Sequence, residues 1–488
     1  MIRSSCSQTP RGINNIPVEL LSSIFRIAKA EPPPHLGTVD IHRQNLSVAR
    51  LTRVCRLWRV VAIQDSVLWS NISFSTSRLS TIRCAAEFLR RSRRAMLKVQ
   101  IMDIPHCALA TDLVEEIAQQ SHRIVEFEAV GLSKLIGEAL VHPANNLSRL
   151  TINGNDSEEL PVIFGGLIPR LERLTLSNPS GWSLCLFPDI TNAVLFCGGN
   201  GGSMSSLMGF LDGARKLEVL SLSRYRDSSA PDRKIVRKSI PLPHLRELNL
   251  SFCNSSRILG HLDLPPSAHV SILAGPEPEH QDIFRYIPNA PEFRRFLSDT
   301  QSLTIVLRPA DNEFYLSMRR LNRTSCFLRV YDDRKQLGEQ WILRSVNAAP
   351  QFKQFLNIES LTVSVEGCPI PWKLWLSRLD ILVRIDVDSI DLSELILALS
   401  VETCHRPICP SLRYLSVERK GSGTPVDYSR LRSCLLSRAE AGCPVLRLEV
   451  PSEDWVRIVQ ADPRWKELTA SQGNVSWPSV SPNAHQTY

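Results

Sequence analysis

The sequence predicts an α+β protein in which a small all-α helical domain is followed by an α/β solenoid of short repeats. Two amphipathic helical segments within residues 13–72 predict the small domain. A pattern of the form Leu-x-x-Leu-x-Leu returns along most of the remaining chain and predicts the solenoid. The chain has 488 residues, which is too long for one ordinary core, so at least two units are expected.

The domain boundaries follow from these patterns. The repeat pattern begins at about residue 95, where the helical part of the sequence ends. We therefore expect a disordered N-terminus at residues 1–12, the helical domain at 13–72, a connecting helix at 73–94, an irregular solenoid at 95–468 and a disordered C-terminal tail at 469–488.

The composition is that of an ordinary globular protein, with 43% hydrophobic and 22% charged residues. No apolar run reaches the roughly 18 residues that a membrane span requires, and the N-terminus lacks an apolar signal core, so we expect an intracellular protein of the cytoplasm or nucleus. The 13 cysteines are scattered and odd in number, which argues against a disulfide framework. The net charge of +8 is modest, so neither nucleic acid nor membrane is expected as a partner.

The first helical segment begins near Pro17, a residue favoured at the start of a helix. Its apolar residues recur at helical spacing over more than half of the helix surface, which is wide for so short a segment. The proline-rich run at 31–37 ends it. The apolar residues of this segment are Leu20, Leu21, Ile24, Phe25, Ile27 and Ala28.

A second helix is expected from about Leu46, with arginines on the stripe opposite its apolar face. Leu68, Trp69 and Ile72 follow and are expected to close the small core. The apolar stripe of the second helix is formed by Val48, Leu51, Val54, Cys55, Trp58, Val61 and Ala62.

Three short stretches carry a resemblance to a known family. They read Ile16-Pro17-x-Glu19-Leu20-Leu21-x-x-Ile24-Phe25, then Val54-Cys55-Arg56-x-Trp58-Arg59, then Leu68-Trp69. In this order they resemble the F-box motif, and the chain as a whole resembles large fungal F-box families. Two departures are Ile16, where leucine is commoner, and the longer loop at 30–45; the first conserves volume.

The resemblance implies that the helical domain docks a Skp-type adaptor and, through it, a cullin-RING ubiquitin ligase. The excess of apolar side chains is compatible with a partner surface, although the same residues could instead pack against the rest of the chain. The implied adaptor-binding residues are Ile16, Pro17, Leu20, Leu21, Ile24, Phe25, Val54, Cys55 and Trp58.

The repeat pattern is clearest in four copies, which begin at Leu147, Leu171, Leu217 and Leu245, after a degenerate copy at Ile124. The successive first positions differ by 23, 24, 46 and 28 residues, and Val194-Leu195-Phe196 lies at the middle of the double interval. Less regular copies begin at Ile358, Leu382, Leu412 and Cys443, and helix-like stretches occupy 109–120, 205–214, 290–297 and 428–441. Phrases such as Leu171 to Asn178 and Leu245 to Ser251 resemble the leucine-rich repeats of F-box proteins, and Cys253 stands where such repeats carry Asn or Cys.

Stacked repeats of one strand and one helix would leave the strands lining one concave face. Because strand side chains alternate, the second and fourth residues after each first apolar residue should lie on that face, away from the core. Most of these residues are polar, and a target protein could bind them, although polar residues must face water in any solenoid. The face residues proposed for substrate contact are Arg149, Thr151, Arg173, Thr175, Glu247, Asn249 and Tyr414.

The sequence shows no phosphate-binding loop, nucleophile elbow or zinc-protease helix. The glycines at 198–202 lack a lysine and the dinucleotide spacing, and Cys404, His405 and Cys409 lack a fourth ligand at zinc spacing. We therefore expect no catalytic residue, no metal and no cofactor, and predict a non-catalytic substrate receptor of a ubiquitin ligase. The alternatives are a leucine-rich-repeat scaffold that acts outside ubiquitin transfer, and an enzyme within the irregular region 255–354.

Overall fold

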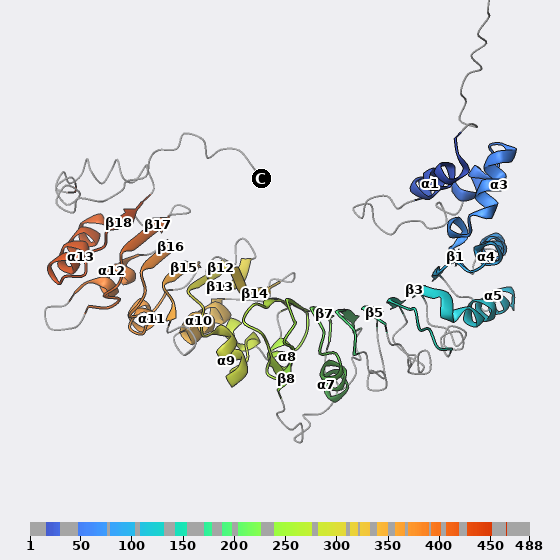
Figure 1. Ribbon diagram of the computed structural model, residues 1–488. Helices are drawn as coiled ribbons and strands as arrows, with labels where there is room; N and C mark the ends of the chain where they lie inside the picture. The colour runs from blue at the N-terminus through green and yellow to red at the C-terminus, as the bar shows by residue number, and fades with distance from the viewer. Residues whose placement is uncertain are drawn as a thin grey trace, which may run out of the picture. The chain divides into compact units, whose positions relative to one another are not determined.

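A computed structural model gives the fold of this protein (Figure 1). Within the described part of the chain, no helix has the length and apolar composition needed to cross a bilayer. The predicted disordered ends, the glycine loop at 198–202 and Cys404-His405 lie outside the described residues. The described residues are 16–29, 47–75, 79–102, 108–130, 142–153, 170–177, 188–197, 204–225, 239–275, 282–308, 313–320, 323–331, 339–349, 357–366, 369–389, 392–401, 407–418, 427–450 and 465.

Inter-residue contacts divide the chain into two compact units. The first comprises Met1–Glu218 and Arg224–Ile235, and the second comprises Val219–Ser223 and Val236–Tyr488. Each unit mixes helices with strands, so the predicted mixture of helix and strand is confirmed. The first unit contains α1 (Val18–Lys29), a short helix at 47–51, α3 (Arg56–Gln64), η2 (Ser66–Trp69), β1 (Asn71–Ser75), α4 (Leu79–Ser92), β2 (Leu97–Met102), α5 (Ala108–Gln119), η3 (Ser121–Arg123), β3 (Ile124–Val130), β4 (Arg149–Asn153), β5 (Arg173–Ser177), β6 (Asn192–Phe196) and α7 (Met204–Gly213).

The strands of the first unit form a parallel sheet in the order β1-β2-β3-β4-β5-β6. Along the sheet, apolar residues stay in register, so that Leu150 of β4 lies between Phe127 of β3 and Leu174 of β5. Each of these three side chains is buried. On each strand, the residues directly before and after the buried one are more exposed. The repeated pattern therefore places alternate side chains of each strand in a continuous core.

The sheet of the first unit begins earlier than the sequence indicates. The segment predicted as a connecting helix, 73–94, starts with strand β1, and helix α4 follows only from Leu79. Ile72, expected to close the helical core, is buried, and its backbone belongs to β1, where it pairs with Val99 of β2. The reason is that the stretch Leu97–Met102 offers a parallel partner, which a local helical pattern does not reveal.

The second unit has a larger sheet, in the order β7-β9-β11-β14-β13-β12-β15-β16-β17-β18, and a small parallel pair β8-β10. Helices lie along one side of this sheet (Figure 1). Its elements are β7 (Val219–Ser223), β8 (Ile240–Pro241), β9 (Glu247–Ser251), α8 (Ser255–Leu259), β10 (Leu262–Asp263), β11 (His269–Ala274), η6 (Ile283–Tyr286), α9 (Pro291–Leu297), β12 (Ser302–Arg308), β13 (Glu313–Arg320), β14 (Arg323–Val330), α10 (Glu339–Ala348), β15 (Ser360–Val365), α11 (Trp372–Leu376), β16 (Arg384–Ser389), α12 (Ser393–Leu399), β17 (Tyr414–Glu418), α13 (Tyr428–Glu440) and β18 (Arg447–Glu449).

The irregular region 255–354 contains an antiparallel insertion that the repeat search did not predict. Strand β14 pairs in parallel with β11, β13 runs antiparallel to both its neighbours, and β12 pairs in parallel with β15. The spatial order β14-β13-β12 is thus the reverse of the chain order, and the ladder stays continuous through the region. The repeat pattern describes parallel strands that recur at a regular spacing. The strands β12, β13 and β14 are joined by two consecutive antiparallel connections, so they do not match that pattern.

The other predicted strands and helices are found where the pattern placed them. The copies at Leu147, Leu171, Leu217 and Leu245 give β4, β5, β7 and β9, the midpoint residues form β6, and the later copies give β15 to β18. The predicted helices correspond to α5, α7, α9 and α13. Cys253 is buried, and its thiol donates to the carbonyl oxygen of Leu222 at 3.3 Å, which joins the segment after β9 to strand β7.

Candidate functional site

The N-terminal helices of the first unit pack around a small apolar core. Leu21 and Phe25 of α1 are buried, and the ring of Phe25 meets that of Trp58 on α3 with centroids 4.9 Å apart. The indole nitrogen of Trp69 donates to the carbonyl oxygen of Ala62 at 2.6 Å, which fixes η2 beneath α3. One face of the short helix α1 therefore depends on α3 and η2 for its burial.

The single second helix expected from Leu46 is interrupted. A helix at 47–51 is followed by turn residues 52–54, and α3 begins at Arg56. Cys55 has an extended backbone and its sulfur accepts the amide hydrogen of Trp58 at 3.5 Å, so it acts as the N-cap of α3. The break moves Val54 off the helical stripe and leaves it exposed.

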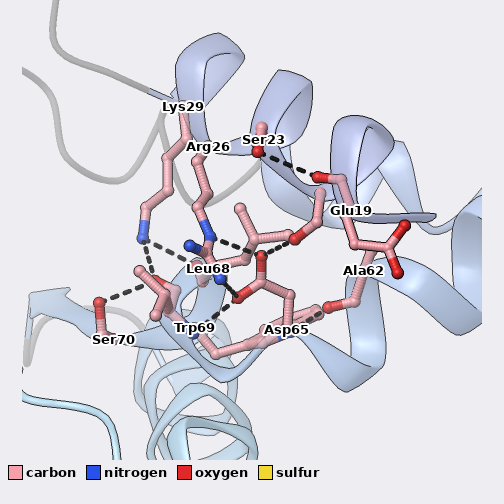
Figure 2. Close-up of polar contacts among 11 residues, drawn as sticks. Glu19, Ser23, Arg26, Lys29, Ala62, Asp65, Leu68, Trp69 and Ser70 are labelled. Atoms are coloured by element: carbon pink, nitrogen blue, oxygen red, sulfur yellow. Dashed lines mark hydrogen bonds and ion pairs between the residues drawn. The ribbon is translucent and has the colours of Figure 1, made fainter. Parts of the chain in front are cut away.

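A carboxylate between α3 and η2 holds helix α1 in place (Figure 2). Asp65 accepts hydrogen bonds from Nε and Nη2 of Arg26 at 2.8 and 2.9 Å, and from the hydroxyl of Ser22. It also accepts the backbone amide of Val67 at 3.1 Å and so caps η2. The side chain of Asp65 is 4% exposed and that of Arg26 is 52% exposed. One buried acid therefore connects α1 to the turn between α3 and η2.

The electrostatics of this network favour the charged form of Asp65. Burial opposes ionisation, but the hydrogen bonds from Arg26 and Ser22 outweigh burial and lower the pKa of Asp65 from its ordinary value of 3.8. Lys29 extends the network at the end of α1 by donating to the carbonyl oxygen of Leu68 at 2.8 Å (Figure 2). Burial lowers the pKa of Lys29 to about 8.

The outer surface of α1 carries apolar side chains that face solvent in this chain. Leu20 is 58% exposed and Ile27 is 72% exposed. Single exposed apolar residues are ordinary, but several on one short helix form a surface that a partner can cover. We name six of these exposed apolar residues the α1 surface. They are Val18, Leu20, Ile24 and Ile27 of α1, together with Val54 and Val60.

This geometry agrees with a comparison against protein families. The family model described as F-box-like matches residues 13–75. This segment is an F-box-like domain. No curated protein matches the chain.

The F-box-like domain divides the predicted adaptor-binding residues into three groups by burial. Leu21 and Phe25 are buried in its core, Ile16, Cys55 and Trp58 are half-buried, and the remaining members are exposed. The exposed members are Pro17, Leu20, Ile24 and Val54. In the sequence all nine carry the same apolar signal, and only the packing of α1 on α3 separates them.

Sequence reasoning missed the residues that fix α1. Asp65, Arg26 and Ser22 are charged or polar, so a search for apolar periodicity passes over them. One local signal was available, because Asp65 directly precedes the Ser66–Trp69 turn, as a capping residue precedes a helix. Val18, Ile27 and Val60 of the α1 surface were also missed as candidates.

The residues proposed for substrate contact lie on the strand face opposite the core. In the first unit, Arg149 and Arg173 are exposed and neighbour each other, and Thr151 pairs with Thr175. Glu126 forms ion pairs with Arg149 at 3.5 Å and with Lys98 at 2.9 Å, measured between nitrogen and oxygen.

The residues proposed for substrate contact in the second unit lie on the face of its sheet that is opposite the core. Glu247 is exposed, and the amide of Asn249 donates to the hydroxyl of Ser221 at 3.4 Å. Tyr414 is half-buried, with the guanidinium of Arg384 at 4.0 Å and that of Arg447 at 5.2 Å from its ring centroid. Contact of these residues with a target remains a prediction.

Among the described residues, no group of three or more His, Cys, Asp or Glu side chains is placed to hold a metal ion. Cys409, one of the three metal ligands weighed in the sequence, is buried, and its thiol donates to the carbonyl oxygen of Leu376 at 3.4 Å. Burial raises the pKa of Cys409 to about 12. This thiol therefore contributes to packing.

Proposed function

We propose that this protein is a substrate receptor of a Skp-cullin-F-box type ubiquitin ligase. F-box domains bind Skp-type adaptors of cullin-RING ligases, and F-box proteins are in general non-catalytic substrate receptors. The observation that carries the proposal is the α1 surface, which lies within the F-box-like domain and is covered by no other described part of the chain. Such a receptor acts inside the cell, in the cytoplasm or the nucleus.

The adaptor contact is assigned to the α1 surface rather than to every residue of the motif. Leu20 and Ile24 lie one helical turn apart, so one partner groove can accept both. Leu21 and Phe25 support the contact from inside, because they anchor α1 to α3. The ring of Trp58 packs against that of Phe25 at a tilt, so its loss would disturb the core before it affected any contact with the adaptor.

We further infer that the strands of both units are leucine-rich-repeat-like repeats whose open faces capture the target. The in-register parallel ladders and the buried leucine positions support this interpretation. Cys253 supports it as well, because its thiol satisfies a carbonyl group of the preceding strand. In such a ligase the chemistry takes place on a separate conjugating enzyme, and the receptor supplies proximity.

Co-purification with a recombinant Skp-type adaptor tests the adaptor contact. We expect the full chain to bind, and the double variant Leu20→Asp with Ile24→Asp to lose at least about tenfold in affinity, because two charges would enter an apolar contact. Leu397→Asp is the matched control, because Leu397 of α12 is 65% exposed and lies outside the F-box-like domain. A wild-type chain that does not bind, or a double variant that binds equally well, would show that the proposal is wrong.

A further inference from the structure

The antiparallel strands β13 and β14 present a surface unlike that of the parallel strands around them. On β13, Phe314 and Met318 are buried, and the ring of Phe314 meets that of Trp341 on α10 with centroids 5.7 Å apart. Because side chains alternate along a strand, Tyr315 and Arg319 lie on the opposite face of the sheet. This is the face to which the repeat pattern assigns target contact.

Aromatic and basic side chains gather on that face. Arg329 of β14 is paired with Tyr315, and the rings of Tyr315 and Phe327 have centroids 5.7 Å apart. Both rings are half-buried, both arginines are exposed, and Tyr331, just beyond β14, is 45% exposed. We name Tyr315, Arg319, Phe327, Arg329 and Tyr331 the β13–β14 patch.

The two arginines of the patch differ from the other arginines on this face. On the other strands of the second unit, every described arginine of this face is paired with a carboxylate. These pairs are Arg308 with Asp388, Arg384 with Asp386 at 2.7 Å, and Arg447 with Glu449 at 2.5 Å. Arg319 and Arg329 form no ion pair or side-chain hydrogen bond within the described part of the chain. Among the described residues, the patch therefore places two arginines that have no carboxylate partner there beside two half-buried rings and the exposed ring of Tyr331.

We propose that the β13–β14 patch is a docking site for an acidic protein segment that carries an apolar or aromatic residue. A guanidinium group matches a carboxylate through two parallel hydrogen bonds, so the arginines select acidic side chains. The rings of Phe327, Tyr315 and Tyr331 supply apolar area for an anchoring residue, and Arg and Tyr are the residue types that dominate contact energies at interfaces. The inference rests on the proposed function in one respect: the segment belongs to the captured target.

A nucleic acid could also stack on aromatic rings beside arginines, but the neighbouring residues disfavour it. A single strand requires a basic groove that follows its backbone over several nucleotides. Beyond β12 the described arginines of the same face are already paired with Asp386, Asp388 and Glu449, so no row of free positive charges continues from the patch to follow a phosphate backbone. Strands lie about 4.8 Å apart, so a short peptide can engage the patch without reaching these carboxylates.

The test selects peptides on the purified full chain from a phage-displayed random library. The enriched peptides should be rich in Asp and Glu next to an aromatic or aliphatic residue. Their affinity should fall by at least about tenfold for the double variant Arg319→Glu with Arg329→Glu, and also for Phe327→Ala. Arg294→Glu with Arg295→Glu is the matched control, because these exposed arginines of α9 carry the same charge.

Three outcomes would overturn the proposal: no enrichment, enriched peptides without acidic residues, or unchanged affinity in the charge-reversed variant. A poly(dT) oligonucleotide that binds the wild type and loses binding in that variant would also overturn it in favour of nucleic acid. Thermal unfolding of each variant shows whether it folds, and a folded Phe327→Leu variant replaces Phe327→Ala if that one does not. Adaptor binding is measured on the same preparations, so failure of the peptide arm is distinguishable from failure of the proposed function.

Discussion

The variants Arg26→Met and Asp65→Asn each remove one partner of the Arg26–Asp65 pair. Both should loosen helix α1, but by different amounts. Arg26→Met leaves a carboxylate that is 4% exposed, with hydrogen bonds only from Ser22 and Val67. Asp65→Asn leaves a guanidinium that is 52% exposed and therefore hydrated. The first change should cost more, because it leaves the buried charge without its partner.

The magnitudes follow from this difference in burial. Breaking a fully buried ion pair costs about 3–5 kcal/mol, and the exposure of Arg26 lowers the expected cost of Arg26→Met to about 2 kcal/mol. Asp65→Asn keeps an oxygen for the Val67 amide and should cost about 1 kcal/mol. These values correspond to roughly thirtyfold and fivefold more frequent opening of α1.

Native-state hydrogen exchange of the α1 amides is the assay, because a chain with two units does not unfold in one step. Arg90→Met is the matched control, since Arg90 pairs with Glu87 on the surface, and exchange should not change. Equal effects of Arg26→Met and Asp65→Asn, or effects no larger than that of the control, would refute the reasoning.

The pH dependence provides a second check on the same network. The folded pKa of Asp65 lies below 3.8 in the wild type, so its contribution to stability is complete above that pH and is lost as the pH falls below it. Arg26→Met removes a hydrogen bond that lowers this pKa, so the pKa rises. Protection of the α1 amides against hydrogen exchange, corrected for intrinsic exchange rates, should therefore fall less in the variant than in the wild type as the pH is lowered. An equal fall in both proteins would contradict this.

The other predictions concern burial. Leu21→Ala should destabilise the F-box-like domain by about 2–5 kcal/mol in denaturant unfolding, and Leu20→Ala should change it by less than about 0.5 kcal/mol, because Leu21 is buried and Leu20 is exposed; equal effects would be evidence against the assigned orientation of α1. Burial lowers the pKa of Lys29 from 10.5 to about 8, so α1 protection should rise between these pH values and this rise should disappear in Lys29→Met; a rise that persists would exclude Lys29 as its cause. Burial raises the pKa of Cys326 and Cys409 to about 12, so iodoacetamide at pH 8 should label them, by mass spectrometry, only after denaturation; labelling of the native chain would show that they are accessible.

Apolar periodicity predicted which segments pack, but it could not separate core from surface on α1. Leu20, Leu21, Ile24 and Phe25 have the same signal in the sequence, and apolar residues surround more than half of the helix. The packing of α3 and η2 against one side of α1 decides that Leu21 and Phe25 are buried. Asp65 sets this orientation through contacts between residues that are 39 and 43 positions apart, which no local pattern reports.

The sequence by itself determined the F-box-like motif, the repeated strands and the side of each strand that enters the core, because these depend on local spacing and on the alternation of side chains. Only the tertiary structure decided how the region 255–354 joins the ladder, since strand partners depend on contacts that are distant in the chain. It also decided which arginines of the open face are neutralised, because Arg308 meets a carboxylate 80 positions away, whereas Arg319 and Arg329 meet none among the described residues.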